Sequence, residues 1–216
     1  MRRTGRESFS FVVSLLLIAR AAAYGGESAA DILEKVQGKY ESIRDASLTF
    51  TRHVVFGVTQ TRQDFAGTLA MKKGNRYRIE LEDQTIVTDG KSVWTYSKIN
   101  NQVFVDAYKE DSVSFSPDRV LVNAPENYTA AILGKEEVGK KEASILKLVP
   151  KSDKSNLKWM KVWVDRDEWL MRKIQLLDIA DNLTTYEVGS LKLNAGLPDS
   201  TFRFTPPPGV EVIDVR

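Results

Sequence analysis

Few residues in this chain have the type and spacing that catalysis or metal binding requires. The only histidine, His53, alternates with Thr49 and Thr51, so we expect an ordinary sheet residue that faces away from Leu48 and Phe50. The chain has no cysteine, and without a cysteine or a second histidine we expect no zinc site. No Gly-x-Ser-x-Gly elbow, phosphate-binding loop or dinucleotide-binding glycine pattern occurs.

Carboxylates gather in two places, with Asp165, Asp167 and Glu168 in one group and Asp178 and Asp181 in the other. Both groups fall where a hairpin or a strand should end, and turns favour aspartate because its side chain hydrogen-bonds the nearby backbone. We therefore interpret them as turn residues. A calcium site and a paired-carboxylate glycosidase stay open as alternatives, although no further motif favours either. We predict no catalytic residue, no bound metal and no cofactor.

Apolar and aromatic side chains at alternating positions are the more prominent feature. Trp94 and Tyr96, in the segment Thr-Asp-Gly-Lys-Ser-Val-Trp-Thr-Tyr-Ser-Lys of residues 88–98, lie two residues apart and so share one face of a strand. Such a face is either a packed sheet core or the wall of a cavity for an apolar ligand, and periodicity does not decide between them. The residues on such faces, which would form the core in the first case and line the apolar cavity in the second, are Leu48, Phe50, Phe65, Leu69, Met71, Tyr77, Ile79, Trp94, Tyr96, Trp159 and Trp163.

Residues 1–23 have the order of a secretory signal peptide. Three arginines precede an apolar run at residues 9–18, and three alanines follow at residues 21–23. The apolar run is too short for a transmembrane helix. We therefore predict cleavage after Ala23 and a mature single domain of residues 24–216.

The mature protein should be close to neutral. Residues 1–23 carry four arginines and one glutamate, so their removal changes the formal charge from +2 to −1 and leaves no electrostatic case for nucleic acid. The missing cysteine excludes both disulfides and a lipid-modified N-terminus. In a bacterium with two membranes, these features predict a soluble, unlipidated protein in the periplasm.

The hydrophobic pattern predicts one helix followed by many strands. Residues 28–43 have apolar positions at helical spacing, with Ser28 as N-cap. From residue 46 the period changes to two, which predicts about ten or eleven antiparallel strands with short turns. Residues 114–134 interrupt them with two prolines and clustered apolar side chains, which predict one or two short helices.

A sheet of that many twisted strands must curl. We predict a mainly β fold, in which the antiparallel sheet forms a barrel if it closes and a half-barrel if it does not, and in which the N-terminal helix and the mid-chain helices cover the apolar concave face. The residues that we predict to cover it are Ile32, Leu33, Val36, Val120, Leu121, Ile132 and Leu133.

Several stretches resemble, in the same order, the LolA family of periplasmic lipoprotein carriers. They are the first helix with Ser-Leu-Thr-Phe-Thr-Arg-His-Val, residues 86–105 with Thr-Asp-Gly-Lys and Trp-Thr-Tyr, residues 146–178 with Pro-Lys and an Asp-Arg-Asp turn, and residues 202–214 with Phe-Arg-Phe-Thr-Pro-Pro-Pro-Gly-Val. The resemblance spans residues 29–214. It implies a half-barrel with a helical lid, and a carrier without catalytic activity that shields the acyl chains of lipoproteins in an apolar cavity.

The resemblance also implies partners. It implies that the carrier takes lipoproteins from an inner-membrane lipoprotein-releasing ABC transporter and passes them towards the outer membrane, to a receptor where the organism has one. We expect the carrier to be a monomer.

One position departs from the family pattern. Members often have a Lys/Arg-Arg-Pro run after the second strand, and its arginine latches the lid through hydrogen bonds to helix backbone. Here Lys73 stands at the arginine position and Gly74 at the proline position. Because lysine lacks the planar fork of arginine, we predict a latch that is weaker or differently connected.

Three other functions remain as alternatives. The first is a lipid- or lipoprotein-sensing regulator of envelope stress with the same half-barrel architecture, a group that usually carries an additional domain. The second is the outer-membrane receptor of the same system, which the missing lipidation cysteine disfavours. The third is an enzyme, which the absence of catalytic motifs disfavours.

Overall fold

The structure is a computed structural model that describes residues 27–109 and 124–216. The predicted signal peptide, Val120 and Leu121 lie outside the described residues. The helical elements are α1 (Ala29–Ser42), α3 (Ala124–Asn127) and the 3-10 helix η2 (Asp199–Phe202). The strands are β1 (Asp45–Val55), β2 (Arg62–Lys72), β3 (Arg76–Leu81), β4 (Gln84–Asp89), β5 (Ser92–Ser97), β6 (Gln102–Ala107), β7 (Tyr128–Val138), β8 (Lys141–Pro150), β9 (Leu157–Asp165), β10 (Met171–Asp178), β11 (Leu183–Leu193) and β12 (Glu211–Asp214).

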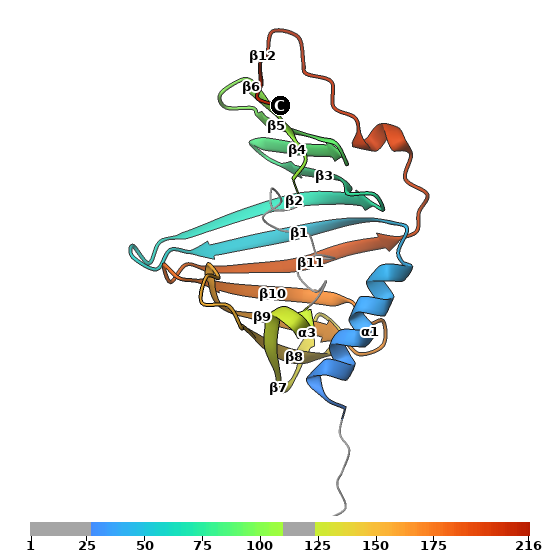
Figure 1. Cartoon of the computed structure of the whole chain (residues 1–216), viewed down its shortest axis with the longest axis vertical. Helices are drawn as coiled ribbons and strands as arrows, with labels where there is room; N and C mark the ends of the chain where they lie inside the picture. The colour runs from blue at the N-terminus through green and yellow to red at the C-terminus, as the bar shows by residue number, and fades with distance from the viewer. Residues whose placement is uncertain (1–26, 110–123) are drawn as a thin grey trace, which may run out of the picture.

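The strands form one open, strongly twisted sheet (Figure 1). Its order is β12-β6-β5-β4-β3-β2-β1-β11-β10-β9-β8-β7, so two meanders, β1–β6 and β7–β11, are joined through the pairing of β1 with β11. All neighbours are antiparallel except β12 and β6. The prediction of an incomplete antiparallel barrel is confirmed, and the described residues form twelve strands in place of the ten or eleven expected.

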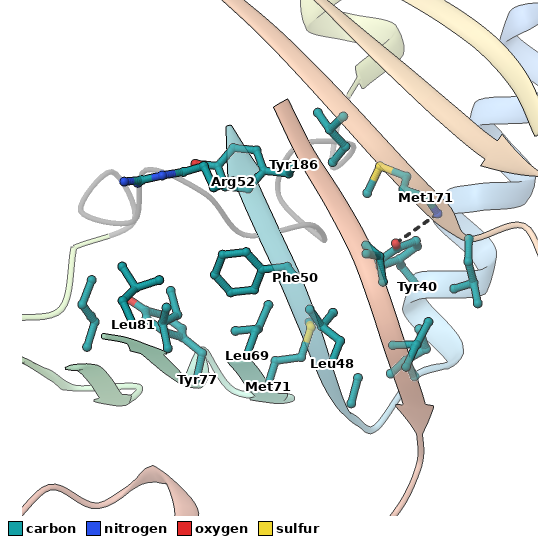
Figure 2. A pocket seen from close by; sticks show the side chains of 18 of the residues that line it. Tyr40, Leu48, Phe50, Arg52, Leu69, Met71, Tyr77, Leu81, Met171 and Tyr186 are labelled. Carbon is teal, nitrogen blue, oxygen red and sulfur yellow. Dashed lines mark hydrogen bonds between the residues drawn. The ribbon is translucent and has the colours of Figure 1, made fainter. Parts of the chain in front are cut away.

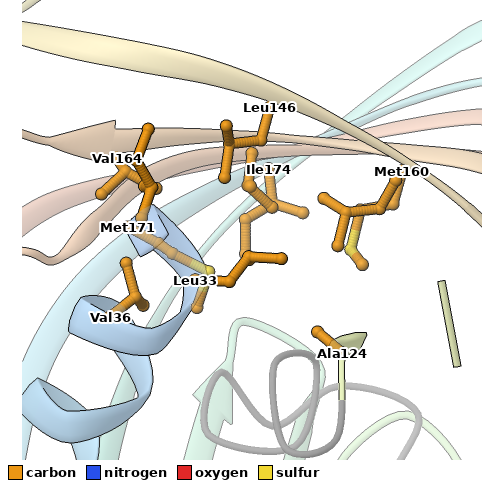
Figure 3. Packing of buried hydrophobic residues seen from close by; sticks show 11 residues of the cluster. Leu33, Val36, Ala124, Leu146, Met160, Val164, Met171 and Ile174 are labelled. Atoms are coloured by element: carbon orange, nitrogen blue, oxygen red, sulfur yellow. The ribbon is translucent and has the colours of Figure 1, made fainter. Parts of the chain in front are cut away.

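Helix α1 forms where the apolar spacing predicts it. Ser28 and Asp31 make a capping box, in which each side chain accepts a hydrogen bond from the backbone N–H of the other residue, at 3.1 and 2.8 Å. The helix buries Ile32, Leu33 and Val36 against the concave face of β8–β10, in a cluster that includes residues such as Leu146, Val162 and Ile174 (Figures 1 and 3). These three residues therefore cover the sheet as predicted.

The prediction of helix at Ile132 and Leu133 is wrong, because both residues lie in strand β7. Their side chains are 42% and 51% exposed, and a bulge follows Ile132 in the pairing with β8. The apolar run of residues 130–133 is only four residues long, too short to tell a strand from a helix. Pairing with β8 along nearly the whole of β7 holds the segment extended. Only α3, with four residues, is helical in the described part of this region.

The chain after β11 covers the convex face of β3–β5. Asp199 of η2 forms ion pairs with Lys72, at 2.6 Å, and with Arg76, at 2.8 Å. Phe202 is 1% exposed, and the guanidinium of Arg76 lies 6.0 Å from the centre of its ring. In this half of the sheet, the convex face is covered by the chain that follows β11, whereas the concave face borders a cavity.

Candidate functional site

A cavity of about 310 Å³ lies on the concave face of the sheet. Its wall is formed by β1–β5 together with β10 and β11, and the last turn of α1 closes one end (Figure 2). At that end the backbone N–H of Met171 donates a hydrogen bond to the hydroxyl of Tyr40, at 3.4 Å. The cavity therefore lies between the curved sheet and the edge of the helix that covers it.

Six of the residues predicted to line an apolar cavity do line it. They come in pairs from three adjacent strands, and alternation directs each pair to the concave side. Figure 2 shows most of them pointing into a common space. The six are Leu48, Phe50, Leu69, Met71, Tyr77 and Ile79.

Sixteen further residues complete the lining. For four residues of β11 the sequence does contain a pattern that predicts an inward position. Tyr186 and Val188 lie two residues apart, as do Leu191 and Leu193, so each pair shares one face of the strand. No pattern in the sequence indicates that β11 pairs with β1, and this pairing brings these residues to the cavity. The sixteen are Tyr40, Ile43, Ala46, Arg52, Leu81, Gln84, Ile86, Val93, Thr95, Leu170, Met171, Ile174, Tyr186, Val188, Leu191 and Leu193.

Trp94 and Tyr96 do not line the cavity, which corrects their predicted placement. Val93 and Thr95 are the residues of β5 that face it, so the two aromatic rings project from the opposite face. There the ring of Tyr96 packs against Phe204, with centroids 5.9 Å apart. The spacing of the two aromatics correctly predicts that they share a face, but that face is the convex one.

Trp159 and Trp163 also project from the convex face, because Met160 and Val162 of β9 face the concave core. Trp163 is buried and donates a hydrogen bond from Nε1 to Glu136, at 2.8 Å, while Lys173 lies over its ring. Phe65 lies on the concave side, paired with Arg52, but outside the cavity lining.

Lys73 lies in the turn between β2 and β3 and is exposed. Its backbone N–H donates to the carbonyl of Arg44, at 3.0 Å, and its own carbonyl accepts from Arg76. No hydrogen bond or ion pair of the Lys73 side chain reaches another described residue. Its role as a latch stays a prediction.

The carboxylate groups are parts of turns. Asp165 is fully buried and accepts hydrogen bonds from the backbone N–H groups of Asp167 and Glu168, at 2.9 and 3.2 Å, and from Arg172. Burial raises the pKa of Asp165, but the hydrogen bonds from Arg172, the turn backbone and Lys141 outweigh it and lower the pKa to about 2. Asp165 thus stays ionised and stabilises the turn into β10.

The other polar groups singled out in the sequence have structural partners as well. Asp178 accepts from the backbone N–H groups of Ala180 and Asn182, at 2.8 and 2.9 Å, within the turn into β11. His53 lies 2.6 Å from Asp64 on the facing strand. Within residues 27–109 and 124–216, no group of three or more histidine, aspartate or glutamate side chains has an arrangement that could hold a metal ion.

None of the helices in the described part of the chain combines the length and the apolar character that crossing a membrane requires. Among the described residues, the cavity with its largely apolar lining is the feature best suited to bind a ligand.

A family model described as outer membrane lipoprotein carrier protein LolA matches residues 41–205. An outer-membrane lipoprotein carrier protein of Histophilus somni is 27% identical over 191 residues, which cover 87% of this chain and 89% of that protein. An uncharacterized protein of Methanocaldococcus jannaschii is 29% identical over 86% of this chain, and the match spans only 54% of the archaeal protein.

Solved structures show the same fold at low sequence identity. An uncharacterized conserved protein of Thermus thermophilus superposes with a TM-score of 0.59 at 14% identity, over 86% of this chain and 98% of that chain. A crystal structure of MucB superposes with a TM-score of 0.50 at 16% identity, over 82% of this chain and 62% of that chain.

Proposed function

The chain belongs to the LolA family, and on that premise we propose that it is a carrier of lipoproteins. It binds their acyl chains in the concave cavity and moves them through the periplasm from the inner to the outer membrane. The observation that carries the proposal is the position and lining of the cavity, which offers apolar side chains from seven strands and α1 to one ligand.

The physical requirement for such a carrier follows from the hydrophobic effect. Each buried methylene group contributes roughly 0.8 kcal/mol, so a lipoprotein with several acyl chains does not leave a membrane unaided at a useful rate. A carrier must offer comparable apolar surface and still release its load. Apolar contacts without a dense set of directional hydrogen bonds meet both demands, because they are exchanged readily for those of another apolar surface.

The size of the cavity bears on how it is loaded. Its volume of about 310 Å³ lies at the lower end of the range of roughly 300–1,000 Å³ for small-molecule sites. Several acyl chains need more room, so loading requires the sheet and the edge of α1 to move apart near Tyr40 and Ile43. The proposed donor is an inner-membrane lipoprotein-releasing ABC transporter, and the proposed acceptor is an outer-membrane receptor where one is present.

A sensing regulator of envelope stress with the same half-barrel architecture is the second candidate, and MucB shares this architecture. Both functions begin with an acyl chain in the same cavity. They differ afterwards, because a carrier delivers its ligand to a membrane and a sensor retains it while contacting a protein partner.

The test is release of a radiolabelled lipoprotein from spheroplasts by the purified mature protein. We expect the wild type to bring the lipoprotein into the supernatant. Val188→Trp should reduce release several-fold, since the new ring occupies the cavity, whereas Glu187→Trp, on the opposite face of β11, should release as the wild type does. If the lipoprotein stays on the membrane while a known carrier releases it, the carrier proposal fails.

A further inference from the structure

The cavity contains one charged side chain, Arg52, among the described residues that line it. Arg52 projects inward from β1 next to Phe50, and its neighbours across the sheet are Phe65 on β2 and Tyr186 on β11. Figure 2 shows it beside Tyr186, at the end of the cavity away from Tyr40. No carboxylate lines the cavity in the described part of the chain.

The guanidinium of Arg52 is held in place but is not neutralised. Its centre lies 4.2 Å from the centre of the Phe65 ring. Its Nε is buried and donates no hydrogen bond to a described residue. The side chain hydrogen-bonds Tyr186, but no described carboxylate forms an ion pair with it. The stacked ring stabilises the cation only in part, by about 0.5–2 kcal/mol.

Tyr186 does not supply the missing negative charge. Burial raises the pKa of the Tyr186 hydroxyl, although the neighbouring Arg52 acts in the opposite direction. The phenol is therefore protonated and neutral near pH 7. A permanently charged guanidinium at the end of an apolar cavity is thus left with donors for an anion that the described residues do not provide.

We propose that Arg52 binds the anionic group of a lipid whose acyl chain lies in the cavity. The inference rests on the proposed function only in requiring that the cavity binds acyl chains. Guanidinium N–H groups match carboxylate and phosphate oxygens in a bidentate geometry, so a fatty acid and a phospholipid share the required chemistry. Ester- and amide-linked acyl chains are uncharged and would make no such contact. The cavity would therefore select acidic lipids, alone or beside a lipoprotein.

The direction of the bound chain follows from β1. Its inward residues run from Arg52 through Phe50 and Leu48 to Ala46, a span of about 20 Å at the rise of an extended strand. An acyl chain anchored at Arg52 can thus extend along apolar side chains towards the end of the cavity at α1. The headgroup would lie near Tyr186 and the methyl end near Ile43.

The test compares a naturally fluorescent fatty acid, cis-parinaric acid, with its uncharged methyl ester on the full mature chain. We expect the wild type to bind the acid roughly 10-fold more tightly than the ester or better, as a hydrogen bond to a charged group implies. Arg52→Gln should remove that preference, and Arg52→Lys should retain part of it. Arg78→Gln, which removes the same charge from the convex face beside Glu80, should bind as the wild type does.

The outcomes separate the two proposals. Equal binding of acid and ester by the wild type overturns the role of Arg52 and leaves the cavity intact as an acyl-chain site. Binding of neither probe overturns the proposed function as well. A loss of preference in Arg78→Gln equal to that in Arg52→Gln overturns the site, because surface charge would then explain it. Lysophosphatidic acid and palmitate can then compete with bound cis-parinaric acid. If lysophosphatidic acid displaces the probe more strongly, the preferred anionic group is a phosphate, and if palmitate does, it is a carboxylate.

Discussion

The rings of Tyr96 and Phe204 lie 5.9 Å apart and are inclined by 44°, which joins strand β5 to the chain after η2. This contact lies on the convex face, behind the cavity wall. It belongs to the same covering as Phe202 and the ion pairs of Asp199. The C-terminal Phe-x-Phe segment therefore has a structural role, which is to cover the back of the strands whose front faces the cavity.

Phe202→Ala should lower the free energy of unfolding by about 3–5 kcal/mol, because it removes a fully buried ring that has no replacement nearby. The binding of an acyl-chain probe, measured under conditions where the variant is folded, should change little. Urea denaturation followed by circular dichroism measures the stability.

Phe104→Ala is the matched control, since Phe104 is 43% exposed on β6. It should cost about 1 kcal/mol or less. Equal losses in the two variants would show that the covering by the C-terminal chain adds no stability of its own.

Asp165 should make stability depend on acid pH. Its pKa is about 2 in the folded chain, against an ordinary value of 3.8. A lowered folded-state pKa means that the unfolded chain takes up the proton first as the pH falls. The stabilisation by Asp165 is thus fully present above about pH 4 and is lost between about pH 4 and pH 2, and it amounts to about 2 kcal/mol.

Asp165→Asn should be less stable than the wild type at pH 7 and should lose less stability between pH 4 and pH 2. Chemical denaturation at a series of pH values measures both effects. Asp153→Asn serves as the control, because Asp153 is exposed and has no hydrogen bond or ion pair with a described residue. If the free energy of unfolding falls with pH in the same way for the wild type and for Asp165→Asn, then Asp165 is not the group responsible for the loss of stability in acid.

Leu33→Ala should destabilise the protein by about 2–5 kcal/mol, because Leu33 is 2% exposed in the cluster that α1 shares with β8–β10. Glu34→Ala, at the next and exposed position, should stay within about 0.5 kcal/mol of the wild type. Thermal unfolding of the two variants makes the comparison. A small effect of Leu33→Ala would mean that α1 rests on the sheet only loosely.

Local patterns predicted much of this fold because they are local in origin. The capping residue Ser28 and the spacing of Ile32, Leu33 and Val36 follow from helix geometry, and strand alternation follows from the pleat. An Asp-Gly pair is a general signal for a tight turn, and the structure has one at Asp89-Gly90. Gly90 has φ of +91° there, and a Cβ would lie 2.3 Å from the carbonyl oxygen of Gly74.

The sequence did not predict which side of each strand faces the cavity. Period two defines two faces but does not identify the concave one, and on β5 the larger residues Trp94 and Tyr96 are on the convex side. They are there because the C-terminal chain covers that face, a contact between segments about a hundred residues apart. The same limit applies to β7, where pairing with β8 overrides a short apolar run.

The placement of the tryptophans leads to a prediction for fluorescence. None of the four lines the cavity, so binding of an acyl chain should leave the wild-type tryptophan emission nearly unchanged. Phe50→Trp puts an indole ring into the lining, and its emission should shift to shorter wavelength when palmitate is added. Thr51→Trp, one residue along β1 and exposed on the opposite face, should not respond. A wild-type or Thr51→Trp response as large as that of Phe50→Trp would place the ligand outside the cavity.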